Sequence, residues 1–439
     1  MTTGKKLKFL RLILAGIFMT VSLLAFSGFS AFAAYIMHIE CAPAVLSWIS
    51  GASLWALAFV FFHMALARFA GRVYCSILCP LGILQDAAGL IPAAKNKPRK
   101  DIIQIRCLIF GIVAGILFCA SAAGFFFLDP YSIFGRGISV FLWGGTAPLA
   151  AVLLLTLFKK RFFCTYICPV GTMLGFVARN SIHRLVISDK CVNCGKCVKV
   201  CPAGCIEPEK KMLDNERCLR CMECISSCPA EAIAPARISE RGTSPDRREF
   251  LKRCGYTAAG FAAGYILTRL GIIQKLFTRS KGSGIYPPGA AKLELFERKC
   301  TGCLLCTKVC PQKIIVPAAN GTGPVELDLS TNFCRYNCNL CGNICPTGAI
   351  RKLSLSAKQR LQIAAAAFDP SVCIVFQEGA KCGKCGKACP TGAVTLRKNG
   401  TPKFNAKLCI GCGACHAVCP TEAYSLKSIS EQIPLDVKK

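Results

Sequence analysis

Cysteine is the residue whose number and spacing carry the clearest chemical signal in this chain. Of the 439 residues 33 are Cys, and many fall in runs of the form Cys-x2-Cys-x2-Cys-x3-Cys-Pro. In such a run the first three thiolates bind one [4Fe–4S] cluster, and the fourth, before Pro, binds the neighbouring cluster. Structural zinc sites use separated ligand pairs, and disulfide frameworks are typical of small secreted domains. The spacing therefore predicts iron–sulfur clusters.

The runs form three pairs, so the crossed rule assigns four ligands to each of six [4Fe–4S] clusters. The first pair of runs predicts the sets Cys191, Cys194, Cys197 with Cys228, and Cys218, Cys221, Cys224 with Cys201. The second pair predicts Cys300, Cys303, Cys306 with Cys345, and Cys334, Cys338, Cys341 with Cys310. The third pair predicts Cys373, Cys382, Cys385 with Cys419, and Cys409, Cys412, Cys415 with Cys389.

Cys373 is the least regular of these predicted ligands, since it precedes Cys382 by nine residues. Either a loop fills this gap, or Cys373 is an ordinary Cys and its cluster has three protein ligands.

Two more Cys pairs repeat each other in apolar sequence. Cys75 and Cys79 precede Pro80-Leu-Gly82, and Cys164 and Cys168 precede Pro169-Val-Gly171. If each pair is helical, its spacing puts both thiols on one helix face, and the four thiols could converge. They are interpreted as a redox site or an extra metal site, with buried apolar packing as the alternative. The Cys outside any motif are interpreted as structural: Cys41, Cys107, Cys119, Cys205 and Cys254.

The elements that must carry these residues begin with four apolar stretches, each long enough to span a bilayer. They cover residues 9–36, 47–69, 102–127 and 139–158. Lys and Arg gather before the first, between the second and third, and after the fourth, whereas the opposite loops contain only Arg136. The positive-inside rule places the N-terminus and the region after the fourth stretch in the cytoplasm.

The predicted fold class is a membrane α-helical bundle plus α+β two-cluster ferredoxin-like modules. Residues 1–180 are the membrane domain and 181–240 a cytoplasmic two-cluster module. Residues 241–283 form a linker with a fifth membrane segment at 254–273, and 284–439 hold four clusters in two modules.

The net charge of +31 raises the question of nucleic-acid binding. However, each [4Fe–4S] cluster with four thiolates carries about −2, and membrane orientation explains the basic clusters. The sequence has no Gly-rich nucleotide motif and only four His. It therefore predicts one-electron transfer, with no nucleic-acid partner.

Residues 60–235 resemble the NapH family of membrane ferredoxin-type proteins. The resemblance rests on the two Cys-x3-Cys-Pro segments, the loop Asp129-Pro130-Tyr-Ser-Ile-Phe-Gly135-Arg136 and the two-cluster module. The second half is similar to NapG, from Arg247-Arg248-Glu-Phe250-Leu251-Lys252 and Tyr286-Pro287-Pro288-Gly289-Ala290 onwards. This implies a NapH–NapG fusion that takes electrons from menaquinol or ubiquinol and delivers them to a periplasmic reductase. Nitrate reductase is the named example, and the related NosR group leaves the acceptor open.

Arg247-Arg248-x-Phe250-Leu251-Lys252 is also similar to a twin-arginine export signal, which carries folded, cofactor-loaded domains. Its use would put residues 284–439 in the periplasm. Asp246 and the charge of Arg269 in the segment behind it depart from the usual pattern.

Quinol oxidation also needs proton acceptors, and titratable residues near membrane depth are candidates for this role. The candidates are His38, Glu40, His63 and Asp129, and Arg136 is a candidate ligand for a quinone oxygen. Each of these residues could instead have a structural role in a loop, in the helix bundle or as a cap of a turn. The expected protein is an inner-membrane conduit from the quinone pool to a terminal reductase or cytochrome. The alternatives are metalloenzyme maturation, redox sensing, or a ferredoxin subunit that faces the cytoplasm.

Overall fold

The computed structural model describes residues 3–28, 36–49, 54–90, 103–119, 128–139, 147–207, 209–237, 247–272, 284–317 and 324–435. Contacts divide the chain into two compact units, Met1–Leu276 and Phe277–Lys439. Each unit has its own secondary structure and its own cysteine sites.

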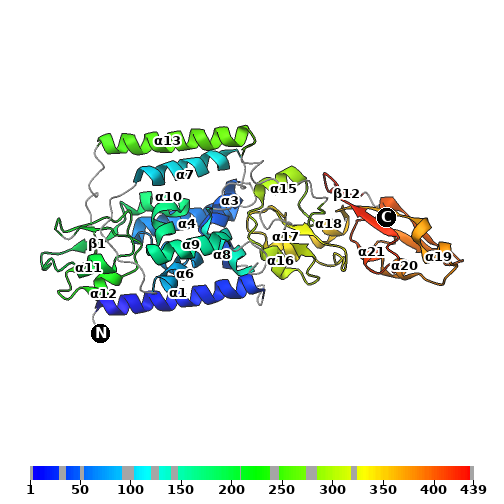
Figure 1. The fold of residues 1–439 in the computed structure, drawn as a ribbon, viewed down its shortest axis with the longest axis horizontal. Coiled ribbons are helices and arrows are strands. Elements are labelled where there is room, and N and C mark those ends of the chain that lie inside the picture. Colours follow the sequence, from blue (N-terminus) through cyan, green and yellow to red (C-terminus); the bar gives the residue numbers. More distant parts are fainter. Residues whose placement is uncertain are drawn as a thin grey trace. The chain divides into compact units, whose positions relative to one another are not determined.

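Unit 1 is built on helices that lie side by side (Figure 1). They are α1 (Thr3–Ser27), α3 (Cys41–Ile49), α4 (Leu54–Ala70), α7 (Ile103–Phe118), α9 (Ala147–Phe158), α10 (Pro169–Ala178) and α13 (Arg247–Arg269). Their outward surface carries many large apolar side chains, including Trp55, which is 79% exposed, and Phe158, which is 75% exposed. An apolar exterior of this extent is typical of a surface that faces lipid or a partner.

By length and composition, one helix in the described part of the chain can cross a membrane, namely residues Gly4–Ser27. The helices in the second, third and fourth predicted stretches, Leu54–Ala70, Ile103–Phe118 and Ala147–Phe158, are apolar but shorter. Parts of the predicted spans, residues 29–35, 50–53, 101–102, 120–127 and 140–146, lie outside the described residues.

The loop predicted at residues 129–136 is wrong, because most of it is helix α8 (Pro130–Ser139). The Asp129 carboxylate accepts hydrogen bonds from the N–H groups of Tyr131 and Ser132, at 3.2 and 2.9 Å, and so caps the helix. Pro130 occupies the first helical position, where its missing N–H costs nothing.

The backbone leaves the helical conformation at the second Cys of each paired motif, so the condition that each pair is helical is not met. Cys75 and Cys164 lie in α5 (Tyr74–Ile77) and η3 (Phe163–Ile167), whereas Cys79 and Cys168 have extended backbones with ψ of 112° and 116°. A residue before proline is disfavoured in the helical conformation, and Pro begins the next helix in both cases. These helices are α6 (Pro80–Ala88) and α10.

A small α+β module follows α10 within unit 1. Strand β1 (His183–Ile187) pairs antiparallel with β4 (Ile233–Arg237), and β2 (Ile206–Glu207) pairs with β3 (Met212–Leu213). Two short helices follow the cysteine loops, α11 (Lys196–Val200) and α12 (Glu223–Ser227).

Buried Glu216 ties this module to the helices. Its carboxylate pairs with Arg253 of α13 at 2.8 Å, with Arg106 of α7 at 3.8 Å and with Arg179, after α10, at 4.0 Å. The beginnings of α7 and α13 therefore meet the module at the same end of the helices (Figure 1).

Helices α7 and α13 pack with their backbones in contact through two glycines from each helix. A Cβ added at Gly111 or Gly115 would lie 2.2 Å from the carbonyl oxygen of Thr257 or Phe261. Advancing four residues along α7 advances the contact four residues along α13, so the two helices run parallel. Small residues at this spacing allow such close approach in membrane helix pairs.

Unit 2 consists of short helices and antiparallel strand pairs. The strand pairs are β5 (Ile315–Val316) with β6 (Glu326–Leu327), β7 (Leu361–Gln362) with β12 (Ile433–Pro434), β8 (Ala365–Phe368) with β11 (Tyr424–Lys427), and β9 (Val394–Leu396) with β10 (Pro402–Phe404). The helices are α15 (Leu293–Lys299), α16 (Leu305–Val309), α17 (Leu340–Ile344), α18 (Leu355–Gln359), α19 (Ile374–Gln377), α20 (Lys384–Ala388) and α21 (Ala414–Ala417).

The segment at residues 284–289, which begins the four-cluster region, packs into unit 2. Gln432, near the other end of the unit, donates to the carbonyl oxygens of Tyr286 and Pro287 at 3.2 and 2.9 Å, and accepts from Gly289 N at 2.8 Å. The first and last described segments of the unit are thereby joined.

Candidate functional site

Four cavities are each lined by one of the crossed cysteine sets. In unit 1 one cavity contains Cys191, Cys194, Cys197 and Cys228, and another contains Cys201, Cys218, Cys221 and Cys224. In unit 2 the corresponding sets are Cys310, Cys334, Cys338 and Cys341, and Cys373, Cys382, Cys385 and Cys419. The four cavities have similar volumes, about 320 to 380 Å³. The fold thus brings three closely spaced Cys together with the Cys-Pro of the paired run.

Cys373 lies in the last of these cavities, so the structure places it beside Cys382 and Cys385 despite the long gap in sequence. Its thiol is buried, and its backbone N–H closes the turn η4 (Pro370–Val372). The residues between Cys373 and Cys382 include helix α19, which accounts for the extra length.

The two remaining sets are also brought together. The thiols of Cys389, Cys409, Cys412 and Cys415 all interact electrostatically with one another. Cys306 interacts in the same way with Cys300, Cys303 and Cys345. Burial raises the pKa of Cys306 above its ordinary value and that of Cys415 to about 12. Binding of a metal, which takes thiolates, would therefore release protons at these sites.

The loops themselves are shaped to surround a buried anion. In four runs the residues on both sides of the second Cys have φ between 52° and 85°: Asn193 and Gly195, Arg220 and Met222, Gly302 and Leu304, Gly411 and Gly413. A left-handed conformation costs a non-glycine residue of order 1–3 kcal/mol and persists where the surroundings enforce it. Such turns form nests of N–H groups that bind anions.

Backbone N–H groups also reach the cysteine sulfurs directly. The N–H two residues after the second Cys hydrogen-bonds its sulfur at Cys221, Cys303, Cys382 and Cys412. Hydrogen bonds to the thiolates of an iron–sulfur cluster stabilise it and tune its reduction potential. The cavities, the strained loops and the N–H groups together fit a [4Fe–4S] cluster.

No three His, Cys, Asp or Glu side chains among the described residues converge as the ligands of one metal ion. A cubane distributes its four thiolates over four separate irons, so its ligands lie further apart than those of a single ion.

Neighbouring sites are close to one another within each unit. In unit 1 Cys224 of one set interacts electrostatically with Cys197 of the other. In unit 2 Cys334 N donates to Cys412 O at 2.9 Å, which joins the loops of two different run pairs.

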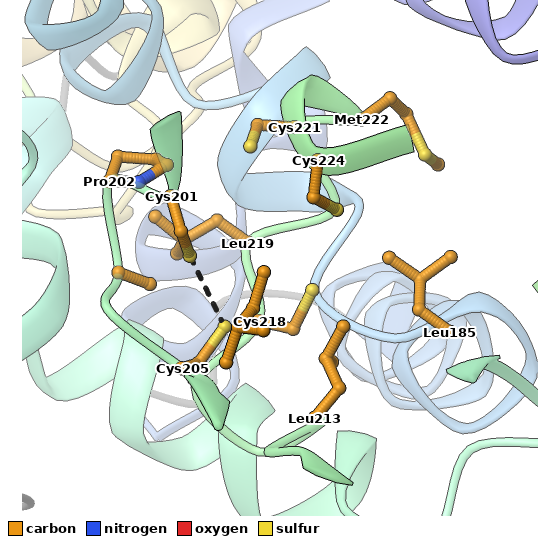
Figure 2. Close-up of a pocket in the computed structure, with 12 residues that line it drawn as sticks. Leu185, Cys201, Pro202, Cys205, Leu213, Cys218, Leu219, Cys221, Met222 and Cys224 are labelled. Atoms are coloured by element: carbon orange, nitrogen blue, oxygen red, sulfur yellow. Dashed lines mark hydrogen bonds between the residues drawn. The ribbon is translucent and has the colours of Figure 1, made fainter. Parts of the chain in front are cut away.

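Cys205, which the sequence places outside any motif, lies among the thiols of one set (Figure 2). Its sulfur is 3.6 Å from that of Cys201. Hydrogen bonding with Cys205 lowers the pKa of Cys201 and brings that of Cys218 to about 6, whereas it raises the pKa of Cys205 itself. Cys201 and Cys218 therefore favour the thiolate form, and Cys205 keeps its proton. Its position in the Cys201-Pro-x-x-Cys205 spacing was the available signal.

The two Cys-x3-Cys-Pro motifs in apolar sequence also bring their thiols together. Cys75, Cys79, Cys164 and Cys168 are buried, and all pairs among them interact electrostatically. Buried Gln85 donates to the sulfur of Cys164 at 3.1 Å, and Gly171 N donates to that of Cys168 at 3.3 Å. The four thiols therefore lie close together in the structure, as the repeated spacing suggested.

Tyr74 gathers several of the predicted quinol-site residues around Cys75. Its hydroxyl donates to the buried carboxylate of Glu40, and its ring lies 5.0 Å from the ring of buried His63. Asp129 interacts electrostatically with Glu40. The sequence analysis missed Tyr74, although it directly precedes the first Cys of the motif.

The other predicted quinol residues are placed as follows. Buried Arg136, on α8, interacts electrostatically with Asp129. His38 is half-buried in η1 (Met37–Ile39).

Among the Cys interpreted as structural, Cys41 and Cys107 are fully buried, Cys119 is half-buried and Cys254 is exposed. Cys41 interacts electrostatically with Cys75 and Glu40.

Comparison with protein families finds three iron–sulfur models in the chain. A 4Fe–4S dicluster domain matches residues 190–232 and 380–423, and a second dicluster model matches 299–363. A 4Fe–4S binding domain matches twice, at 52–98 and 141–188, and these two segments contain the paired membrane motifs.

Several curated relatives are named ferredoxin-type proteins. The chain is 31% identical over 155 residues to the methylamine utilization ferredoxin-type protein MauN of Methylorubrum extorquens, covering 34% of this chain and 53% of that protein. It is 33% identical over 138 residues to MauN of Paracoccus denitrificans, covering 30% and 48%. It is 32% identical over 138 residues to the ferredoxin-type protein NapH of Haemophilus influenzae, covering 30% and 47%. The chain spans about half the length of the curated relatives it matches.

The fold and these matches identify 4Fe–4S binding domains in the chain and a similarity to ferredoxin-type proteins. The N-terminal region is helical, contains a candidate membrane span and is consistent with an inner-membrane protein. The resemblance to NapH-type ferredoxin proteins predicted from the sequence is confirmed.

Proposed function

We propose that this protein takes electrons from menaquinol or ubiquinol in the bacterial inner membrane and passes them through its clusters to a terminal reductase or cytochrome. A quinol releases two electrons and two protons, so its site needs an electron acceptor beside proton acceptors. The group around Tyr74 carries the proposal, because buried Glu40, His63 and Asp129 lie next to the thiol site that includes Cys75. Titratable groups at membrane depth are rare without such a role.

The six crossed sets of 24 Cys are the proposed [4Fe–4S] ligands, including Cys373. Their support is the cavities, the N–H groups directed at sulfur and the dicluster matches. When bound, each cluster supplies one-electron redox chemistry. The chain's part is to hold the thiolates, exclude water and set the potential through hydrogen bonds.

The order of electron transfer follows from neighbouring loops. In unit 1 the set that includes Cys218 and Cys201 lies nearer the helices, because Ser76 Oγ donates to Arg220 O at 3.4 Å and Arg72 donates to Glu216 O at 3.5 Å. In unit 2 the Cys334–Cys412 hydrogen bond favours transfer between the two sets that contain these residues.

We propose that the helices of unit 1 cross the membrane several times, with the first module in the cytoplasm. The basic ends of several helices meet that module, as Lys8 of α1 pairs with Glu223 at 2.7 Å and Arg68 of α4 donates to Asn180 O at 2.5 Å. Basic residues gather on the cytoplasmic side of membrane proteins.

We propose helix α13 as the fifth crossing; its 23 residues are long enough to span a bilayer, although its composition is less apolar than that of the candidate span Gly4–Ser27. Helix α13 begins at the twin-arginine-like motif beside the module and runs parallel to α7, so its far end leaves the bundle at the opposite side. This supports a periplasmic location for residues 284–439. A C-terminal alkaline phosphatase fusion should be active, whereas activity confined to a cytoplasmic reporter would contradict the export proposal.

The quinol proposal is tested by reduction kinetics in anaerobic, detergent-solubilised full-length protein. A menaquinol analogue should bleach the cluster absorbance, and Glu40→Gln should slow this at least tenfold without altering reduction by dithionite. Glu207→Gln, at an exposed surface ion pair, is the control. Unchanged kinetics in Glu40→Gln, or no reduction of the wild type, would favour the maturation or redox-sensing alternative.

A further inference from the structure

The repeated Cys-x3-Cys-Pro motif includes residues before its first Cys and after its second. Arg72 stands three residues before Cys75, and Arg161 stands three residues before Cys164. Each half therefore reads Arg-x2-Cys-x3-Cys-Pro-x-Gly. Both arginines are at most 1% exposed, which is exceptional for this residue type.

Each arginine contacts the other half of the repeat. Arg72 Nη2 donates to Cys164 O at 3.0 Å, and Arg161 Nη1 donates to Cys75 O at 2.5 Å. The two halves are thus related by a pseudo-twofold exchange of arginines around the four thiols.

The glycine that ends each motif makes room for this exchange. A Cβ at Gly171 would lie 2.4 Å from Arg72 Nη2, and a Cβ at Gly82 would lie 2.9 Å from Arg161 Nη1. The glycine in the Pro-x-Gly sequence shared by both halves therefore leaves space for an arginine from the other half.

The arginines near the thiols differ in their charged partners. Arg161 binds Asp86 through two hydrogen bonds of 2.7 and 2.6 Å, and buried Arg11 pairs with the same carboxylate at 3.0 Å. The charged neighbours of Arg72 are the thiols of Cys75, Cys164 and Cys168. Asp86 thus pairs with Arg161 and Arg11, whereas the guanidinium of Arg72 faces the thiols. A buried charge requires a partner, and ionised thiols would supply one for Arg72.

We propose that Cys75, Cys79, Cys164 and Cys168 together bind one further [4Fe–4S] cluster, the seventh of the chain, framed by Arg72 and Arg161. A [4Fe–4S]²⁺ core with four thiolates carries about −2 and so supplies negative charge beside the buried guanidinium groups of Arg72 and Arg161. Each half of the repeat supplies two ligands, so the site forms only when both halves are folded together. Both halves match the 4Fe–4S binding domain model.

The cluster lies next to the first ferredoxin module. Arg72 donates both to Cys164 O and to Glu216 O, and Glu216 lies two residues before Cys218. A Cβ at Gly71 would lie 2.6 Å from Nε of Arg220, the residue before Cys221. The seventh cluster thus stands between the group around Tyr74 and the set that includes Cys218. The inference rests on the proposed function only for the direction of electron flow, not for the presence of the cluster.

The test is the metal content of anaerobically purified, full-length protein. Wild type should contain about 28 irons and about 28 labile sulfides per chain, whereas six clusters alone give about 24. The double variant Cys75→Ser/Cys164→Ser should lose about four of each, and Mössbauer spectra should lose one [4Fe–4S] component. Cys107→Ser, at a buried Cys of the same unit that does not interact with the four thiols, is the matched control and should keep all of them.

Arg72→Lys and Arg72→Gln give a test that preserves all ligands. Arg72→Lys keeps the positive charge and should retain more of the seventh cluster. Arg72→Gln removes the charge, and the protein should then lose the seventh cluster while the other six remain. The proposal would be overturned by about 24 irons per wild-type chain, by disulfide bonds among the four Cys, or by zinc bound to them. Failure of quinol to reduce a protein with 28 irons would contradict only the proposed function.

Discussion

The two kinds of cysteine site in this chain surround their sulfurs in different ways. In the ferredoxin loops one run contributes three Cys, a distant Cys-Pro contributes the fourth, and backbone N–H groups from strained turns face the sulfurs. At the paired membrane motif the two halves contribute two thiols each, and positive charge comes from buried arginines. Buried Arg220 adds a full charge beside Cys218 in one ferredoxin set, whereas both halves of the paired motif place an arginine beside the thiols. A low dielectric strengthens the attraction of such a charge for an anion.

The largest expected effect comes from removing a remote ligand. Cys201→Ser should abolish the cluster held by Cys218, Cys221 and Cys224, because Cys201 lines the same cavity as these three residues. The cluster held by the Cys that precede Cys201 in sequence should stay intact. Iron analysis with EPR of the reduced protein would measure this. A selective loss of the cluster held by Cys191, Cys194 and Cys197 would break the crossed assignment. At the membrane site, by contrast, Cys79→Ser and Cys168→Ser should have equal effects.

The next largest effect is expected at Glu216, whose carboxylate joins the first ferredoxin module to the helices of unit 1. Glu216→Gln leaves three arginines around a neutral side chain, and breaking a buried pair typically costs about 3–5 kcal/mol. Thermal unfolding of the solubilised protein should show this loss of stability as a lower melting temperature. Glu223→Gln removes the more exposed pair with Lys8 and should cost at most about 1 kcal/mol. Equal losses in both variants would mean that Glu216 is not the anchor of the module.

A smaller effect is expected in the contact between α7 and α13. Gly264→Ala would place a Cβ 2.2 Å from Ile112 O, and overpacking of this kind typically costs about 1–3 kcal/mol. Gly255→Ala in the same helix meets nothing within 4 Å and is the control. Protease sensitivity of the segment after α13 should rise in the first variant alone. No difference between them would argue against the parallel pair.

The smallest effect is expected at Cys205. Cys205→Ala should keep the iron content, because Cys201 and Cys218 remain, but it removes a thiol 3.6 Å from Cys201 Sγ. Loss of one hydrogen bond to a cluster sulfur should lower the reduction potential by on the order of tens of millivolts. Redox titration measures the shift. Loss of iron would instead make Cys205 a ligand.

The sequence predicted the sites whose geometry is local. A tight run of three Cys can close on one cluster wherever it folds, so Cys191, Cys194 and Cys197 are recognised without any tertiary information. The partner Cys228 also followed, because the Cys-Pro repeat is regular.

What the sequence did not reveal depends on contacts between distant segments. Arg72 was read as an orienting charge at a helix end, and only its contact with Cys164, 92 residues away, shows its position beside the thiols. Cys205 and Glu216 were missed for the same reason. The helix after Asp129 was missed because its capping hydrogen bonds are not visible in composition.

The exchange of Arg72 and Arg161 between the two halves has a consequence for biogenesis. Each half contributes only two of the four thiols, and each arginine also contacts the other half, so metal delivered before both halves have folded would meet an incomplete cage. Loading of this site would then report that the whole bundle has been assembled. Separately expressed halves should remain colourless until they are combined.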